Sequence, residues 1–210
     1  VLILTLVFIT NLAQSHDGHK TKDIVLNDLG DLGTVSFPIS CDSDTQKAFN
    51  TGVGLLHHMM YAQAEQLFEK WIEQKPKCAM LYWGYSMSLF HPLWPDRITN
   101  EALTKGLRAL KTASTIDKTP REYAYITTIG KYYENWKTKS ETTRINAWAN
   151  AHTKLYQDYP GDIDATAFYA LSQLVIASKQ DKTFSTNKKV GETLSRILDT
   201  HPFHPGAIHY

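Results

Sequence analysis

The chain is poor in the residues that build disulfide scaffolds, loop-rich folds and charged binding surfaces. Its 210 residues include only two cysteines, 11 glycines and 8 prolines. Two cysteines cannot form the disulfide framework of a small secreted domain, and so few glycines and prolines argue against a loop-rich all-β fold. Lysine plus arginine number 22 against 21 aspartate plus glutamate. A chain so balanced has no long-range positive field, so we expect no nucleic-acid partner.

Motifs of the common catalytic classes are also missing. The sequence has no Gly-x-Ser-x-Gly, no P-loop and no dinucleotide-binding fingerprint. Asp162 and Asp164 stand at the start of a predicted helix, where acidic groups interact favourably with the helix dipole. We interpret them as capping residues and not as a catalytic pair. The sequence therefore favours a non-enzymatic protein, and it implies no cofactor.

What is present is enough for one medium-sized globular domain preceded by an export signal. Hydrophobic residues make up 42% of the chain and charged residues 20%, which excludes wholesale disorder. Residues 1–9 form an apolar run that is too short to span a bilayer but fits the core of a signal peptide. Residues 13–15 (Ala-Gln-Ser) supply the small side chains of a cleavage site. We therefore predict a signal peptide at 1–15, truncated at its start; a membrane anchor or a buried helix is the alternative.

Cleavage after residue 15 would leave a mature protein without a membrane span, exported to the periplasm or the cell exterior. Residues 16–42 have no helical period and are predicted to form an extended arm on the body of the protein. From residue 43 onward, apolar residues recur at helical spacing.

Four prolines divide the helical part into units of similar length. Pro76, Pro120, Pro160 and Pro202 are separated by 44, 40 and 42 residues, and each interval has room for two helices. Such a period is typical of stacked helical hairpins. We predict helices at about 44–59, 61–75, 77–90, 98–116, 120–136, 141–158, 162–178 and 187–200, with a ninth starting near Pro205. The predicted fold is all-α, a right-handed solenoid of antiparallel helical hairpins over residues 43–210. The chain stops inside the start of a predicted helix, so we expect this domain to be truncated at its end.

The first unit resembles a tetratricopeptide repeat. Gly52, Tyr61, Ala64, Phe68 and Pro76 occupy the small, aromatic, small, aromatic and proline positions of that motif. The two small residues would let the helices of one hairpin approach closely, the two rings would fill the gap to the next hairpin, and the proline would end the second helix. Later units match less well because they are longer than the usual ~34 residues.

A more extensive resemblance covers most of the mature chain. The segments LGTVSFP, LLHHMM, CAMLYWGYSMSLFHPLW, DIDATAFYAL and HPGAIHY are similar to those of a family of exported bacterial tetratricopeptide-repeat proteins. The resemblance implies a helical-repeat fold and a location in the cell envelope. That family has no established activity, so no catalytic residues can be carried over from it.

The two cysteines are candidates for a disulfide, since an exported chain folds in an oxidising compartment. Cys41 lies just before the first predicted helix and Cys78 at the start of the third. In a stack of hairpins these two helix starts are neighbours, close enough for a bridge. The alternative is two buried free thiols.

Histidine is the one unusual constituent, with nine residues gathered in clusters. Histidines of these clusters, together with the methionines near them, could hold a copper or zinc ion, but the sequence does not indicate which of them are the ligands. None of the spacings is that of a known metal motif, and packed or capping histidines are the alternative. A metal-binding envelope protein is therefore the second functional hypothesis.

Aromatic residues line the third predicted helix and its exit. Trp83 and Trp94 could form part of a patch that holds an extended peptide or a sugar on the concave face; the alternative for Trp83 is packing between hairpins. The leading functional hypothesis is a non-enzymatic envelope scaffold that binds a peptide or protein on that face, with His57, Trp83, His91, Trp94, His204 and His209 as candidate binding residues. An enzyme with an unrecognised site in the groove is the third hypothesis.

Overall fold

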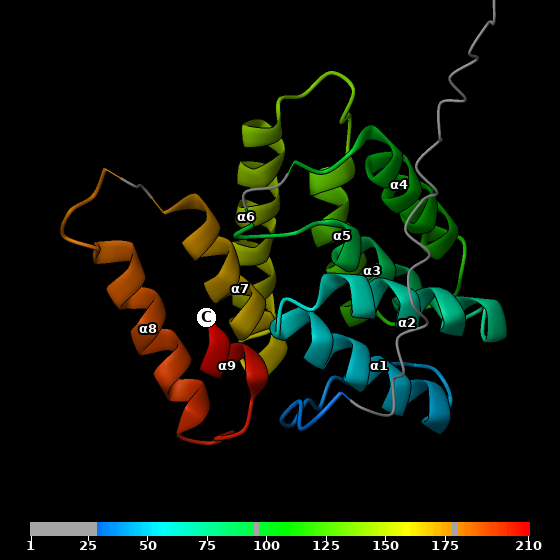
Figure 1. Ribbon diagram of the computed structural model, residues 1–210, viewed down its shortest axis with the longest axis horizontal. Helices are drawn as coiled ribbons and strands as arrows, with labels where there is room; N and C mark the ends of the chain where they lie inside the picture. Colours follow the sequence, from blue (N-terminus) through cyan, green and yellow to red (C-terminus); the bar gives the residue numbers. More distant parts are fainter. Residues whose placement is uncertain (1–28, 95–96, 178–179) are drawn as a thin grey trace, which may run out of the picture.

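A computed structural model describes residues 29–94, 97–177 and 180–210 of the chain (Figure 1). The predicted signal peptide and the first part of the predicted arm lie outside these residues. The described part contains helices and no β-strand, so the all-α prediction is confirmed. The helices are α1 (Ser43–His57), α2 (Tyr61–Gln74), α3 (Ala79–Leu89), α4 (Asn100–Ser114), α5 (Pro120–Tyr133), α6 (Glu141–Asp158), α7 (Ile163–Ile176), α8 (Ser185–Leu198) and α9 (Pro205–His209).

The helix ends follow from local sequence signals. The Asp42 side chain caps α1 by accepting hydrogen bonds from the backbone N–H groups of residues 44 and 45. Thr119 and Glu122 form a reciprocal capping box at α5, where Pro120 occupies the first turn. Asp162 alone caps α7, by accepting from the Ala165 N–H. The observed helix ranges therefore lie close to those predicted from the prolines and the apolar period.

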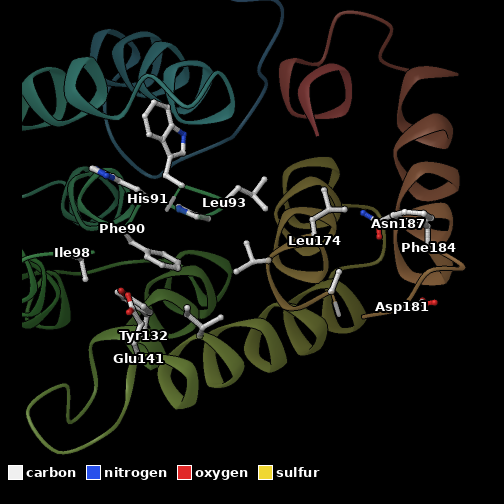
Figure 2. Close-up of a pocket in the computed structure, with 15 residues that line it drawn as sticks. Phe90, His91, Leu93, Ile98, Tyr132, Glu141, Leu174, Asp181, Phe184 and Asn187 are labelled. Atoms are coloured by element: carbon white, nitrogen blue, oxygen red, sulfur yellow. The ribbon is translucent and has the colours of Figure 1, made fainter. Parts of the chain in front are cut away.

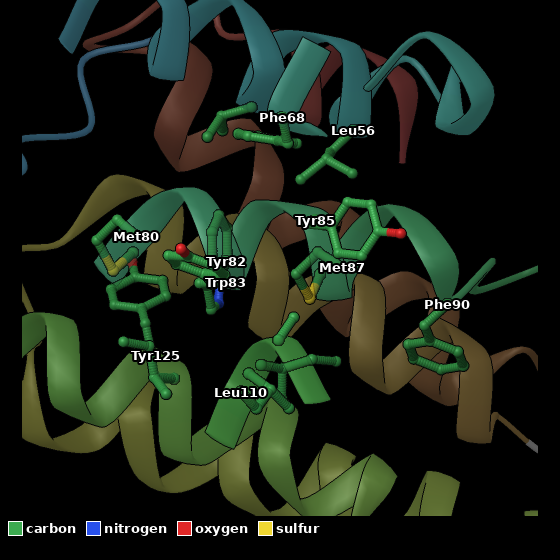
Figure 3. Packing of buried hydrophobic residues seen from close by; sticks show 14 of the residues in the cluster. Leu56, Phe68, Met80, Tyr82, Trp83, Tyr85, Met87, Phe90, Leu110 and Tyr125 are labelled. Atoms are coloured by element: carbon green, nitrogen blue, oxygen red, sulfur yellow. The ribbon is translucent and has the colours of Figure 1, made fainter. Parts of the chain in front are cut away.

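Helix α3 lies at the centre of the molecule. Each helix contacts the next along the chain, and α3 also contacts both α1 and α5. Every residue of α3 is buried, as expected for a helix that is apolar on all sides. Figure 3 shows its side chains packing on both faces, with Phe68 on one side and Tyr125 and Leu110 on the other. None of the described helices is both long and apolar enough to cross a membrane.

The described part of the arm is fastened to this core. Phe37 is fully buried, with its ring 5.1 Å from that of Phe49 and 4.6 Å from that of Tyr125. The backbone N–H of Ser40 donates to the Glu122 carboxylate at 2.7 Å. The arm therefore bridges α1 and α5.

Helix α9 brings the end of the described chain back to its beginning. It contacts α8, α7 and also α1, and Figure 1 shows it lying between α8 and α1. The linker before it contacts the arm as well, because the Thr34 N–H donates to the Phe203 carbonyl at 2.8 Å. Segments from opposite ends of the sequence thus share one region of the structure.

The predicted disulfide between Cys41 and Cys78 is confirmed. The two Cα atoms are 5.8 Å apart and the sulfurs are bonded. The bridge joins the residue before the α1 cap to the residue that precedes α3, so the starts of these helices are neighbours as the hairpin arrangement required. Bridges of this kind persist in oxidising compartments, which agrees with export from the cytosol.

Close packing around Phe68 supplies a test of the core. A Cβ added to Gly52 would lie 2.4 Å from the Phe68 ring, and one added to Gly84 would lie 2.3 Å from it. The ring is fully buried and faces both glycines, so moving it aside requires the surrounding core to repack. We had expected Gly52 to face Ala64, but the atoms nearest to such a Cβ belong to Phe68.

We therefore expect Gly52→Ala to lower the free energy of unfolding by about 1–3 kcal/mol, the usual effect of overpacking. Urea denaturation measures this. In a Phe68→Leu background the Gly52 penalty should shrink, because the smaller side chain leaves room for the methyl group. Gly191→Ala is the matched control, since a Cβ there meets nothing within 4 Å and alanine favours the helix. Equal penalties in both backgrounds would contradict the proposed contact.

Candidate functional site

A groove opens between the segment that follows α3 and the helices α7 and α8. Its volume is about 470 Å³. One wall consists of residues 90–94 together with Tyr132 and Glu141; Leu174 and the beginning of α8 form the opposite side. Figure 2 shows Phe90, Tyr132 and Glu141 on one side and Phe184 and Asn187 on the other, with Leu174 between them.

Large apolar side chains of the groove are exposed to solvent. The exposed fraction is 44% for Leu93, 54% for Trp94 and 59% for Phe184. Leu93 and Phe184 also have left-handed backbones, with φ of 72° and 53°, a conformation that is rare for bulky residues. Strained residues of this kind concentrate at functional sites. The groove thus combines exposed apolar surface with backbone strain on both of its sides.

Two of the predicted binding residues, His91 and Trp94, line this groove. Their common support is Tyr61, whose ring stacks on His91 at 4.7 Å and meets Trp94 edge-on at 6.4 Å. The Tyr61 hydroxyl donates to the Pro92 carbonyl at 3.1 Å, which fixes the turn that carries both residues. Trp83 does not reach the groove, since it is buried among aromatic rings of the core; of its two interpretations, packing between helices is the one observed.

A second hollow of about 640 Å³ lies on the surface of α5 and α6. All its lining residues belong to these two helices or to the residue that follows α6, and Tyr123 is the exposed aromatic side chain among them. It has no left-handed residue in its lining. The groove beside α3 is therefore the better candidate for a built binding site.

Two other predicted residues, His57 and His204, meet in the interior around Asp164. His57 Nε2 lies 3.1 Å from Asp164 Oδ1, and His204 Nε2 lies 3.4 Å from the same oxygen. The His57 side chain is fully buried, and the other two side chains are 2–3% exposed. The three residues come from α1, α7 and the cap of α9. The spacing of the histidines along the chain gave no sign of this cluster.

Neighbouring groups orient the two imidazole rings. The Tyr210 hydroxyl lies 2.9 Å from His57 Nδ1, and Phe168 stacks on the same ring at 4.7 Å. His204 Nδ1 accepts a hydrogen bond from the Ala207 N–H at 3.2 Å. Both Nε2 atoms are thereby turned toward Asp164.

The charge states in this cluster follow from burial and from the mutual contacts. Burial lowers the pKa of His57, although the contact with Asp164 opposes this shift. Burial opposes ionisation of Asp164, but its contacts with His204 and His57 outweigh that effect and hold its pKa below the usual value. The cluster therefore combines a neutral His57 imidazole with an ionised carboxylate at neutral pH.

Asp164 is the member of the cluster that sequence reasoning missed. We interpreted it, with Asp162, as a helix cap; in the structure Asp162 caps α7 and Asp164 faces the histidines. The Asp-x-Asp pattern contains a signal for this second role. One helix cap needs only one carboxylate, so the other aspartate is available for a different contact. His209 is not part of this group: it lies against His58, with ring centroids 4.3 Å apart.

A scan against models of known protein families finds no match, and a search of curated proteins finds none either. The resemblance to exported tetratricopeptide-repeat proteins therefore rests on the motifs alone.

Proposed function

We propose that the protein is an exported, tetratricopeptide-like helical solenoid that binds an extended peptide or protein segment in the groove beside α3. The observation that carries this proposal is the exposure of Leu93, Trp94 and Phe184 around one cavity. Contiguous exposed apolar side chains on a folded protein mark interaction sites, and aromatic anchors contribute most of the binding energy in protein interfaces.

The chemistry of the lining indicates which peptide fits. Its acidic residues are Glu141 and Asp181, so carboxylates border the apolar surface. Hydrogen bonds from Thr183 and Ser185 hold the pKa of Asp181 below its ordinary value, which keeps that carboxylate charged. A segment that places an aliphatic or aromatic side chain beside a lysine or arginine would complement both features.

The disulfide and the predicted signal peptide support an oxidising location for this binding. A periplasmic or extracellular protein meets extended segments of other exported chains, which offer such side chains before they fold. The proposed activity therefore belongs to an exported protein of the cell envelope, and it requires no chemistry at the site.

A random peptide library displayed on phage would test the proposal. We expect selection on the wild-type protein to enrich sequences with an apolar residue beside a basic one. Synthetic copies of the enriched peptides should then bind Trp94→Ala and Phe184→Ala about tenfold or more weakly in fluorescence anisotropy, equivalent to the ~1.4 kcal/mol or more expected for loss of an aromatic anchor.

Tyr123→Ala is the matched control, because Tyr123 is similarly exposed but lines the hollow on α5 and α6. It should leave peptide affinity unchanged. Failure to enrich any common pattern, or loss of binding in Tyr123→Ala with Trp94→Ala unaffected, would refute the proposed groove.

A further inference from the structure

The three-residue cluster in the interior has the geometry of a metal site. The ligand atoms of His57, Asp164 and His204 all lie within 4.8 Å of one another. In a tetrahedral zinc site with bonds of about 2.0–2.1 Å, neighbouring ligand atoms are roughly 3.3–3.4 Å apart. The two measured separations from Asp164 Oδ1, 3.1 and 3.4 Å, match that spacing.

The His204 side chain provides a second indication that an ion binds to this cluster. Its side chain is buried, and its Nε2 atom lies 3.4 Å from Asp164 Oδ1, an ion-pair contact without the geometry of a hydrogen bond. A buried polar atom that makes no hydrogen bond is costly, so it calls for an explanation. A bound ion would satisfy it.

The charge balance of the cluster favours a cation. Asp164 is a buried carboxylate, and its partners among the described ion pairs are the two histidines. A neutral imidazole compensates a buried negative charge only by hydrogen bonding, whereas a divalent ion compensates it directly.

A cavity gives the cluster a route for an ion and for water. It measures about 290 Å³ and is lined by Asp164 and His204 together with polar residues that include Thr34, Ser36 and Thr200. Asp164 and His204 thus border a cavity that can supply water as the fourth ligand, as in zinc sites with three protein ligands.

We propose that His57, Asp164 and His204 bind one zinc ion, with water from this cavity as the fourth ligand. Two nitrogens and one carboxylate oxygen form a ligand set that zinc accepts readily. Because the ligands belong to α1, α7 and the α9 cap, the ion would fasten three distant parts of the chain to one another. The site is separate from the peptide groove, and the inference does not depend on peptide binding.

The groups around the rings are suited to the bound state. Tyr210 can accept a hydrogen bond from His57 Nδ1–H, which leaves the Nε2 lone pair for the ion and orients the ring as second-shell partners do. Zinc binds the lone pair of a neutral imidazole, so His204 must carry its proton on Nδ1 in the bound state. The Ala207 N–H that donates to Nδ1 also lies 3.1 Å from the His204 carbonyl oxygen, so it keeps an acceptor when the proton moves from Nε2 to Nδ1.

Metal analysis of the exported, purified chain tests the proposal. We expect elemental mass spectrometry to find one zinc ion per chain. A strong chelator should remove this ion, and added zinc alone should restore it. Zinc should raise the melting temperature of the stripped protein, since a ligand that binds only the folded state stabilises it. Cobalt(II) in the same site should give the intense visible absorption of four-coordinate geometry.

Variants of the ligands assign the site. His204→Gln and Asp164→Asn should each lower the affinity for zinc about 100-fold or more. Tyr210→Phe removes only a hydrogen bond to a ligand, so it should lower the affinity by the ~10–100-fold that is typical of such changes. His201→Gln is the matched control, because His201 lines the same cavity but lies outside the cluster, and it should bind zinc normally.

Three results would overturn the zinc site: less than stoichiometric zinc in both the isolated and the reloaded protein, preference for a different metal, or unchanged affinity in the ligand variants. Should those variants fail to fold, the wild-type stoichiometry, the zinc-dependent rise in melting temperature and the cobalt spectrum still decide, because a hydrogen-bonded cluster without an ion produces none of them.

Discussion

Replacing both Cys41 and Cys78 with alanine is expected to lower the free energy of unfolding by about 4 kcal/mol. The bridge closes a loop between residues separated by 37 positions, and restricting a loop of that size in the unfolded chain accounts for this value in the chain-entropy model. The loop contains α1 and α2, so the effect applies to the whole first hairpin. Equilibrium denaturation in urea measures it.

Reduction of the wild-type protein provides the control for this prediction. The reduced wild type and the double alanine variant should have the same stability, because both lack the bridge. A difference between oxidised and reduced protein below about 1 kcal/mol would show that the unfolded chain is restricted by other means.

Acid should destabilise the protein through His152. The side chain is buried next to Trp148 and neither ring nitrogen has a hydrogen-bond partner, and burial lowers its pKa to about 3. In the unfolded chain an imidazole has a pKa of about 6.5. Above pH 6.5 neither state is protonated; as the pH falls below it, only the unfolded chain takes up the proton. Stability is therefore lost at up to about 1.4 kcal/mol per pH unit, down to pH 3 or so.

We expect His152→Leu to remove this contribution. Between pH 7.5 and 4.5 the variant should lose about 2–3 kcal/mol less stability than the wild type, whatever its absolute stability. Phe90→Leu is the matched control, because Phe90 is a buried ring against the same Trp148 that carries no titratable group; its pH profile should parallel that of the wild type. Parallel profiles for His152→Leu would refute the prediction.

The helices were predictable because their signals are local. The apolar period marks the buried face of each helix, and the recurring prolines lie beside helix boundaries, as at Pro76 after α2 and Pro120 at the start of α5. The disulfide was predictable for a related reason, because neighbouring helix starts follow from the hairpin pattern. The cap of α1 shows that a local pattern can also mislead. Ser43 and Gln46 have the spacing of a capping box, but Asp42 caps the helix, and Gln46 accepts from the Ile39 N–H of the arm.

The site residues were only partly predictable because they depend on distant contacts. His57 and Asp164 are 107 positions apart, and no spacing rule relates two residues at that separation. Trp83 illustrates the opposite difficulty. A tryptophan side chain suits a binding surface as well as a core. The packing of Phe37 and Tyr125 around Trp83 shows that it belongs to the core.

The contact of α9 with α1 has a consequence for how the protein comes apart. In an open array of repeats each unit touches only its neighbours, so the ends can fray while the middle stays folded. Here residues 204–210 lie against α1 and α7, so loosening α1 or α9 exposes the surface that the other helix covers. Helices α1 and α9 should therefore open together, and their amide hydrogens should exchange with solvent as one cooperative unit.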